Sequence, residues 1–232
     1  MVGAVSNTVS PSQVDKLLGD FGVVVKKARD KIDIEGNNFF KNLGAVWAGE
    51  DAVESSKRLA DSLNEYLIDN LASGFNYIAA GVIDLANYYA KRANKLPMNP
   101  RSISFTHNIS SSPVKSQWDD GSYGFKEPKS LASLIVAFDL LKSSINKTAI
   151  ELSENIARIN AFGNLEIKKV LNNVSNAYTD SLLSSAKLLS DAALKIIEDT
   201  SRKYNISADQ IASYFAQGNK PEGLQSYLDV MK

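Results

Sequence analysis

The chain of 232 residues contains no cysteine and only one histidine, His107. Without cysteine there can be no disulfide, no thiolate metal site and no cysteine nucleophile. His107 lies in a polar stretch with no acidic cluster near it, which argues against a metal site or a Ser-His-Asp triad and predicts an exposed side chain without a function. Phosphate-loop, dinucleotide-binding and EF-hand patterns are also missing. We therefore expect a protein that is not an enzyme, with no cofactor and no catalytic, cofactor-binding or metal-binding residues.

The chain also lacks an excess of charge and a long hydrophobic run. Its net charge is zero, from 26 basic and 26 acidic side chains, so nucleic acid is not an expected partner. The most apolar stretch, residues 74–90, is interrupted by Asn76, Asp84 and Asn87 and is too polar to span a membrane. The first residues carry neither a positive charge nor a long apolar run, so a Sec-type signal peptide is not expected.

Apolar residues recur at helical spacing over most of the first part of the chain. One apolar stripe covers residues 14–46 and a second covers residues 53–89. The break between them contains the triplet Trp47-Ala48-Gly49. This pattern predicts a hairpin of two antiparallel helices over residues 11–93. A kink is expected near Gly36, because glycine weakens a helix.

The next part of the chain has a different composition. Residues 94–128 contain four of the six prolines and a serine-rich run, which is typical of an irregular linker. The alternating residues 102–106 leave a short strand open as an alternative. Such a linker is longer than a connection between packed helices requires, so it is interpreted as either a functional loop or a spacer.

The last part of the chain returns to helical spacing. Two apolar stripes, over residues 131–159 and 167–197, flank the triplet Ala161-Phe162-Gly163 and predict a second helical hairpin over residues 129–204. Residues 205–232 are expected to form a short helical tail. The predicted fold class is therefore all-α, with two long antiparallel helical hairpins that form an elongated four-helix bundle.

The triplet Trp47-Ala48-Gly49, placed between two long amphipathic stripes, carries a family resemblance. The chain resembles the WxG-type helical hairpins, small substrates of bacterial type VII secretion that are grouped as the early-secreted-antigen superfamily. In that family a Trp-x-Gly turn joins two antiparallel helices and an alanine commonly follows a few residues later, which Ala52 matches. The resemblance covers residues 11–93.

The second hairpin extends the resemblance by topology alone. Phe162 and Gly163 stand where Trp47 and Gly49 stand in the first hairpin, which indicates a tandem of two hairpins in one chain. Family members usually pair as two hairpins, so a tandem would supply both within one molecule. If Trp47 only filled a corner, a smaller ring such as that of Phe162 would be enough, and a role for Trp47 in export or partner binding is therefore expected.

The resemblance also implies an export signal of the form Tyr-x-x-x-Asp/Glu near the end of the second helix. Tyr123 and Glu127 have this spacing. They depart from the family pattern because Tyr123 lies about 30 residues beyond the first hairpin, inside the linker. This departure puts direct recognition by the secretion motor in question.

The expected function is that of a non-enzymatic, secreted or secretion-associated helical protein, which acts as an export partner, adaptor or surface effector through helix–helix contacts. Its expected partners are another copy of itself or a second helical-hairpin protein, and the type VII secretion motor. Its expected location is outside the cell or at the cell surface, without a Sec signal peptide. Two alternatives remain open: a helical pore-forming or membrane-active toxin component in which residues 74–90 insert, and a cytoplasmic or phage structural bundle in which the Trp-Ala-Gly match is accidental.

Overall fold

The structure is a computed structural model that describes residues 10–125, 129–216, 218 and 220–232. It is dominated by long helices, so the predicted all-α class is confirmed. The elements are α1 (Pro11–Val46), β1 (Trp47–Ala48), α2 (Glu50–Leu63), the π-helix η1 (Asn64–Asp69), α3 (Asn70–Arg92), β2 (Gly124–Phe125), α4 (Lys129–Ala157), α5 (Leu165–Lys203), α6 (Ala208–Phe215) and α7 (Leu224–Val230).

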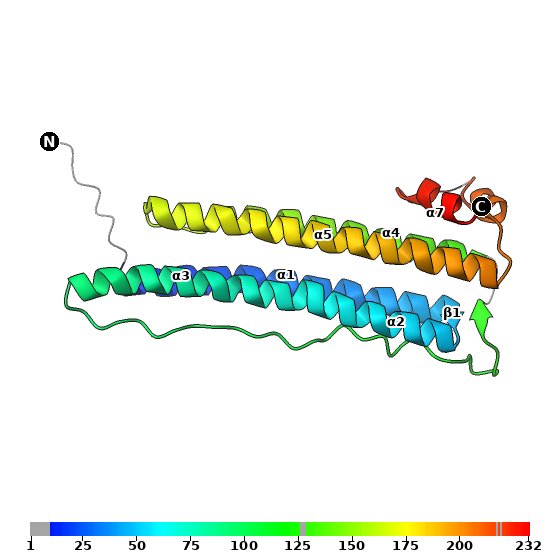
Figure 1. The fold of residues 1–232 in the computed structure, drawn as a ribbon, viewed down its shortest axis with the longest axis horizontal. Helices are drawn as coiled ribbons and strands as arrows, with labels where there is room; N and C mark the ends of the chain where they lie inside the picture. Colours follow the sequence, from blue (N-terminus) through cyan, green and yellow to red (C-terminus); the bar gives the residue numbers. More distant parts are fainter. Residues whose placement is uncertain (1–9, 126–128, 217, 219) are drawn as a thin grey trace.

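The long helices lie side by side along the length of the molecule (Figure 1). The run α2–η1–α3 returns antiparallel to α1, and α5 returns antiparallel to α4. Helix α4 packs extensively against both α5 and α1, and α3 packs against α1 and α5. The short helices α6 and α7 pack on α4 and α5 near the end of the molecule that contains β1 (Figure 1).

Local sequence explains where the long helices begin. Helix α1 starts with a capping box, in which the Ser10 side chain accepts from the Gln13 backbone and the Gln13 side chain accepts from the Ser10 backbone. Asn164 caps α5 through its side-chain oxygen, which accepts from the backbone N–H groups of Glu166 and Ile167 at 3.0 Å each. These caps satisfy amide groups that would otherwise lack partners at a helix start.

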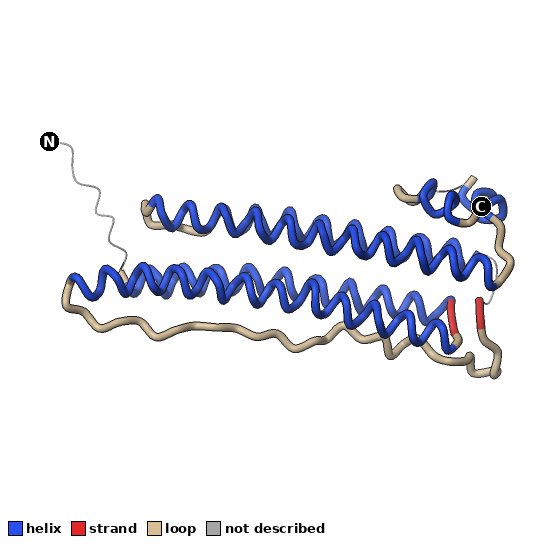
Figure 2. The backbone as a smooth tube through the Cα atoms, viewed as in Figure 1, coloured by secondary structure: helices blue, strands red, loops and turns tan. Residues whose placement is uncertain are grey.

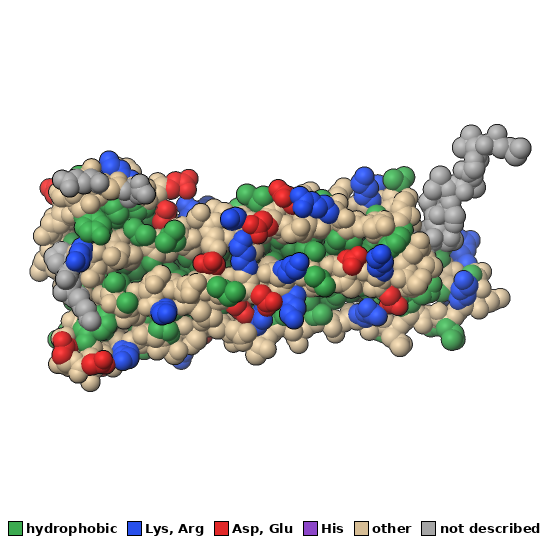
Figure 3. Space-filling model, turned by 180° about the vertical axis from the view of Figure 1, so that it is seen from behind, with side chains coloured by type: hydrophobic (Ala, Val, Ile, Leu, Met, Phe, Trp, Pro, Cys, Tyr) green, Lys and Arg blue, Asp and Glu red, His purple; other side chains and the backbone are tan. Residues whose placement is uncertain are grey.

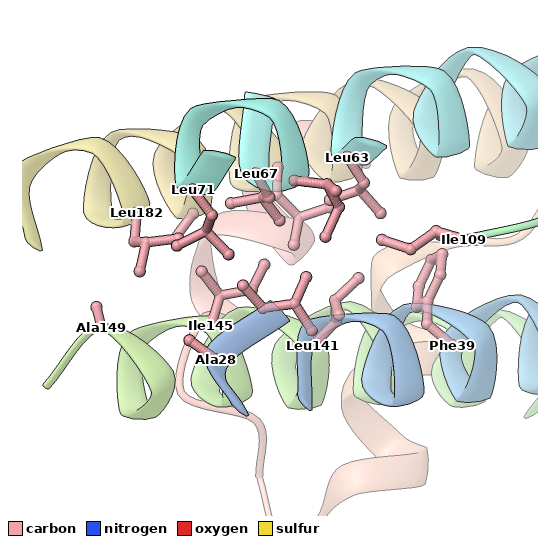
Figure 4. Packing of buried hydrophobic residues seen from close by; sticks show 14 of the residues in the cluster. Ala28, Phe39, Leu63, Leu67, Leu71, Ile109, Leu141, Ile145, Ala149 and Leu182 are labelled. Carbon is pink, nitrogen blue, oxygen red and sulfur yellow. The ribbon is translucent and has the colours of Figure 1, made fainter. Parts of the chain in front are cut away.

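One hydrophobic cluster extends along the whole length of the long helices. Figure 4 shows its middle, where Leu67 and Leu71 face Ile145 and Leu141 across the core. Both Phe39 and Phe40 are buried, at 3% and 0% exposure, and their rings meet edge to face at 5.1 Å between centroids. The face of α1 that is buried is therefore wider than a single stripe, because several elements cover it.

Helix α1 continues through Gly36 without a break. Gly36 has a different role. A Cβ atom at this position would lie 3.0 Å from the side chain of Ile109, which reaches the core between Phe39 and Leu63 (Figure 4). The glycine thus allows the linker to approach the helix closely.

The linker after α3 is an extended segment that follows the helices. We call residues 94–123 the return segment, because they run back from the end of α3 to β2 along the helical surface (Figure 2). Residues 102–106 form no strand, so this alternative is wrong. The segment nevertheless has defined hydrogen bonds, which helix side chains supply in place of a neighbouring strand.

Candidate functional site

The Trp-Ala-Gly corner joins α1 to α2 through a short stretch of extended backbone. Trp47 and Ala48 form β1, which pairs antiparallel with β2 so that Trp47 lies opposite Phe125 and Ala48 opposite Gly124. Gly49 follows with φ at +145°, a conformation that favours glycine. Its N–H donates to the carbonyl of Lys115 at 3.0 Å. Both the turn and its glycine are therefore fixed by the end of the linker.

Trp47 is buried, with 2% of its surface exposed. Its ring stacks on Phe125, with 5.8 Å between centroids and 3° between planes, and Phe125 in turn meets Tyr204 edge to face at 5.3 Å. Trp47 is therefore covered by Phe125 in this structure, and its expected role in export or partner binding stays a prediction. The Trp47 indole nitrogen and the Tyr204 hydroxyl are buried and lack a hydrogen-bond partner among the described residues.

An ion pair and a small residue complete the corner. Lys203, in the last turn of α5, binds Asp51, in the first turn of α2, at 2.9 Å. The hydrogen bond to Asp51 raises the pKa of Lys203 above its usual value. Ala52, the third residue of the family match, is completely buried. The corner between α1 and α2 thus brings in two elements that are far from it in the sequence: β2 and the end of α5.

The structure places Tyr123 beside this corner. Tyr123 directly precedes β2, which pairs with Trp47 and Ala48, and 72% of its surface is exposed. Glu127, the other residue of the candidate export signal, lies outside the described residues. In the sequence Tyr123 lies about 30 residues beyond the first hairpin, inside the linker, and the return segment carries it back to the end of the molecule that contains the Trp-Ala-Gly turn.

The second corner has a different backbone from the first. Phe162 and Gly163 both have positive φ, at +52° and +74°, and the Phe162 N–H donates to the Asn160 side chain at 2.8 Å. Trp47, by contrast, is extended, with φ at −135°. The second corner also lies at the opposite end of the molecule (Figure 1). Phe162 and Gly163 are therefore not brought together with Trp47 and Gly49.

Four asparagines hold the return segment through its backbone, and this device was missed by the sequence analysis. Asn64, Asn76 and Asn87 each use both ends of the side-chain amide: the oxygen accepts a backbone N–H, and the nitrogen donates to the carbonyl of the same residue. Their partners are Ile109 at 3.3 and 2.8 Å, Ile103 at 2.7 and 2.9 Å, and Met98 at 2.6 and 3.3 Å. The fourth, Asn37, donates to the Asn108 carbonyl and accepts from the Ser110 N–H, each at 3.0 Å. We call these four residues the asparagine ladder.

The spacing of the ladder follows from the geometry of the two backbones. Eleven residues separate Asn76 from Asn87 and five separate Ile103 from Met98. Eleven residues of α-helix and five residues of extended chain both advance about 17 Å. Eleven residues also make just over three full helical turns, so Asn76 and Asn87 face the same side.

Asn64 precedes Asn76 by twelve residues, which in a regular α-helix would rotate it about 120° away from the line of the other two. The π-helix η1 begins at Asn64 and lies between them. A π turn accommodates one extra residue, which restores the common face. The π-helix therefore aligns Asn64 with the return segment. The only trace of this spacing in the sequence is the recurrence of Asn-Tyr at residues 76–77 and 87–88, eleven positions apart.

Charged side chains add further anchors. His107, expected to be exposed without a function, is half-exposed and contacts Asp69 of η1 at 2.8 Å through its Nε2 atom. Arg29 of α1 donates to the Thr106 carbonyl and pairs with Asp33, both at 3.0 Å. Asp33 is buried and accepts from the Asn108 side chain, and burial raises the pKa of its carboxyl group. His107 is exposed as predicted, and its contact with Asp69 was not foreseen because the two residues are distant in the sequence.

Comparison of the chain with protein-family models, with curated proteins and with solved structures finds no match. Within the described ranges, no group of three or more His, Asp or Glu side chains is placed to hold a metal ion. None of the described helices is long and apolar enough to cross a membrane. The described residues therefore show packed helices, a return segment whose backbone is held by asparagine side chains, and the exposed Tyr123 beside the buried Trp-Ala-Gly corner.

Proposed function

We propose that the protein is a non-enzymatic helical-hairpin protein of the kind exported by bacterial type VII secretion, and that it acts through protein contacts at the Trp-Ala-Gly end. The observation that carries this proposal is the pairing of β1 with β2. It joins a Trp-x-Gly turn between two long antiparallel helices to the exposed Tyr123 of a candidate export signal. Each feature is weak in the sequence alone, and their proximity strengthens both.

The proposed architecture is an elongated four-helix bundle of two hairpins, one formed by α1 and α2–η1–α3 and the other by α4 and α5. The packing of α1 on α4 and of α3 on α5 supports this arrangement. One hairpin alone would leave its apolar stripe in water, and the second hairpin covers it. A tandem chain of this kind needs no partner hairpin for its core, so its partners would bind the outer surface.

The surface supports a protein partner more than a nucleic acid. Figure 3 shows basic and acidic side chains interspersed over one long face, without a broad patch of either sign. A partner at the Trp-Ala-Gly end would instead meet Tyr123 and the neighbouring polar residues of the return segment. An exposed aromatic side chain in such a position offers contact area at low entropic cost.

Export can be tested in the native host by fractionation of cultures with an intact and with a disabled type VII motor. We expect the protein in the medium or on the surface only when the motor is intact. Tyr123→Ala should reduce export, and Tyr77→Ala is the matched control, because Tyr77 is similarly exposed at 79% but lies on α3. Retention in the cytoplasm of both strains, or equal export of the two variants, would contradict the proposal.

A further inference from the structure

The return segment lies on the long helices without being part of their core. Among the described residues, positions 96–114 form no backbone–backbone hydrogen bond with a helix, and helix side chains bind their backbone instead. Only two apolar side chains of the return segment, Ile109 and Val114, are buried. The long helices, by contrast, share one continuous hydrophobic cluster and satisfy their backbone groups internally. The return segment can therefore come away at a lower cost than any long helix.

Glycines in α1 allow the return segment to dock closely at two places. Gly36 faces Ile109, and Gly44 faces Pro113. A Cβ atom at position 44 would lie 2.7 Å from the carbonyl carbon of Pro113, well inside van der Waals contact. Both contacts involve only the face of α1 that the return segment covers, so they can be lost while the helix itself stays intact.

The chain between the rungs of the asparagine ladder has almost no slack. The five residues from Met98 to Ile103 run beside eleven residues of α3, which span about 17 Å. Five residues of fully extended chain reach about 18 Å at most. One rung therefore cannot move away from the helix while its neighbours stay in place. Release of the return segment should be cooperative, with several rungs lost together.

The far end of the return segment is continuous with the residues that cover Trp47. The Gly49 N–H donates to the Lys115 carbonyl at 3.0 Å, and β2 follows a few residues later. Strands β1 and β2 contain only two residues each, too few to form a stable pair alone. The position of Phe125 over Trp47 therefore depends on the docked return segment as well as on the contact of Phe125 with Tyr204.

We propose that the return segment is a strap that opens as one unit while the long helices stay packed, and that its opening uncovers Trp47. In the closed state Phe125 covers Trp47. In the open state the indole ring meets water or a partner. The use of the open state for partner binding rests on the proposed function. Opening itself is measured on the purified protein, so its failure is distinguishable from a failure of export.

A disulfide between positions 36 and 109 can hold the strap closed. A Cβ atom at position 36 would lie 3.0–3.1 Å from three carbons of the Ile109 side chain, which is close enough for a disulfide. The chain has no native cysteine, so the Gly36→Cys/Ile109→Cys variant can form only this bond within one molecule. The full-length variant is compared in its oxidised and reduced forms by hydrogen exchange, so that each form is the control for the other.

Four protons report on opening along the strap. The amides of Met98, Ile103 and Gly49 each have an acceptor that opening removes, and the Trp47 indole N–H is buried at the far end. In the reduced form the protection of the three amides should agree within about threefold and lie far below that of the helical core. Oxidation should slow exchange of all four protons at least about tenfold. Trp118→Phe identifies the Trp47 signal.

Gly44→Ala tests the same opening without a disulfide. Alanine favours the helix over glycine, but its methyl group displaces Pro113, so the helix and the strap should respond in opposite directions. Exchange at Met98, at the other end of the strap, should become at least about tenfold faster, while the amides of α1 stay at least as protected as before. The matched control is Gly81→Ala, because Gly81 is an exposed glycine of α3 with nothing within 4 Å of an added Cβ. It should leave exchange in the strap unchanged.

Several results would overturn the proposal. Strap amides that exchange as slowly as the helical core would mean that the strap opens only when the whole protein unfolds. Slower exchange confined to the neighbours of the disulfide would mean that the strap opens piece by piece. A Trp47 indole that is unaffected by the disulfide would mean that opening does not uncover it. Equal effects of Gly44→Ala and Gly81→Ala would also contradict it. If Gly44→Ala does not fold, the oxidised and reduced forms of the disulfide variant still decide.

Discussion

Replacement of Asn64 by leucine is the sharpest test of the asparagine ladder. Asn64 is 5% exposed, and its amide satisfies both the N–H and the carbonyl of Ile109, which is also 5% exposed. Leucine has a similar size but can form neither hydrogen bond. The variant loses two bonds worth about 1 kcal/mol each and leaves two backbone groups without partners, so we expect a loss of roughly 2–4 kcal/mol.

Amide hydrogen exchange measures which parts of the chain lose stability in the Asn64→Leu variant. We expect faster exchange at the Ile109 amide, and smaller changes at Ile103 and Met98, because neighbouring rungs hold the same segment. If the return segment detaches before the helices separate, the free energy of global unfolding in urea should fall by less than the local stability measured at the Ile109 amide. The matched control is Asn70→Ala. Asn70 is an exposed asparagine that donates to the Tyr66 carbonyl and Ser181 rather than to the return segment, so its exchange pattern there should not change.

Asn64→Asp separates hydrogen bonding from packing. Aspartate keeps an acceptor for the Ile109 N–H but places a carboxylate against the Ile109 carbonyl, so it should destabilise the segment at neutral pH and do so less in acid, where it can donate. Unchanged protection of Ile109 in both variants would refute the reasoning. An effect of Asn70→Ala as large as that of Asn64→Leu would refute it as well.

Two further predictions concern aromatic side chains. Phe125→Ala removes the ring that stacks on Trp47, so it should cost about 2 kcal/mol of stability. In a Trp118→Phe background it should also shift the fluorescence of Trp47 to the red. A spectrum that stays blue would mean that Phe125 does not cover Trp47. Burial raises the pKa of Tyr178 above its usual value of 10.0. Because the unfolded chain then releases this proton first, the contribution of Tyr178 to stability should be full below pH 10 and fall as pH rises above it. Between pH 9 and pH 11 the free energy of unfolding should fall less for Tyr178→Phe than for the unchanged protein, and an equal fall in the two proteins would contradict this.

The sequence was a good guide to the helices and a poor guide to the linker. The apolar stripes predicted helices over residues 11–46, 50–92, 129–157 and 165–203 within a few positions, because helical periodicity is a local property. The linker was recognised as irregular from its prolines. Its attachment could not be predicted, because a side-chain amide that binds a backbone group leaves no pattern in the residue it binds.

The candidate site shows the same limit. The Trp-Ala-Gly turn was identified as a turn, but the burial of Trp47 under Phe125 depends on a contact between distant segments. Gly36 was interpreted as a kink because glycine weakens helices, whereas the structure uses it to admit Ile109. His107 was judged alone because Asp69 is far from it in the sequence. In each case the partner is non-local.

The sequence by itself determined the all-α class, the positions of the long helices and the place of the two corners. Apolar spacing and the turn residues specify these features within a few turns of chain. Only the tertiary structure decided where the return segment lies, that the π-helix brings Asn64 into the ladder, and that Tyr123 meets the Trp-Ala-Gly corner. These features depend on matching a rise of about 1.5 Å per residue in a helix to about 3.3 Å in an extended chain, and that match exists only once the two lie side by side.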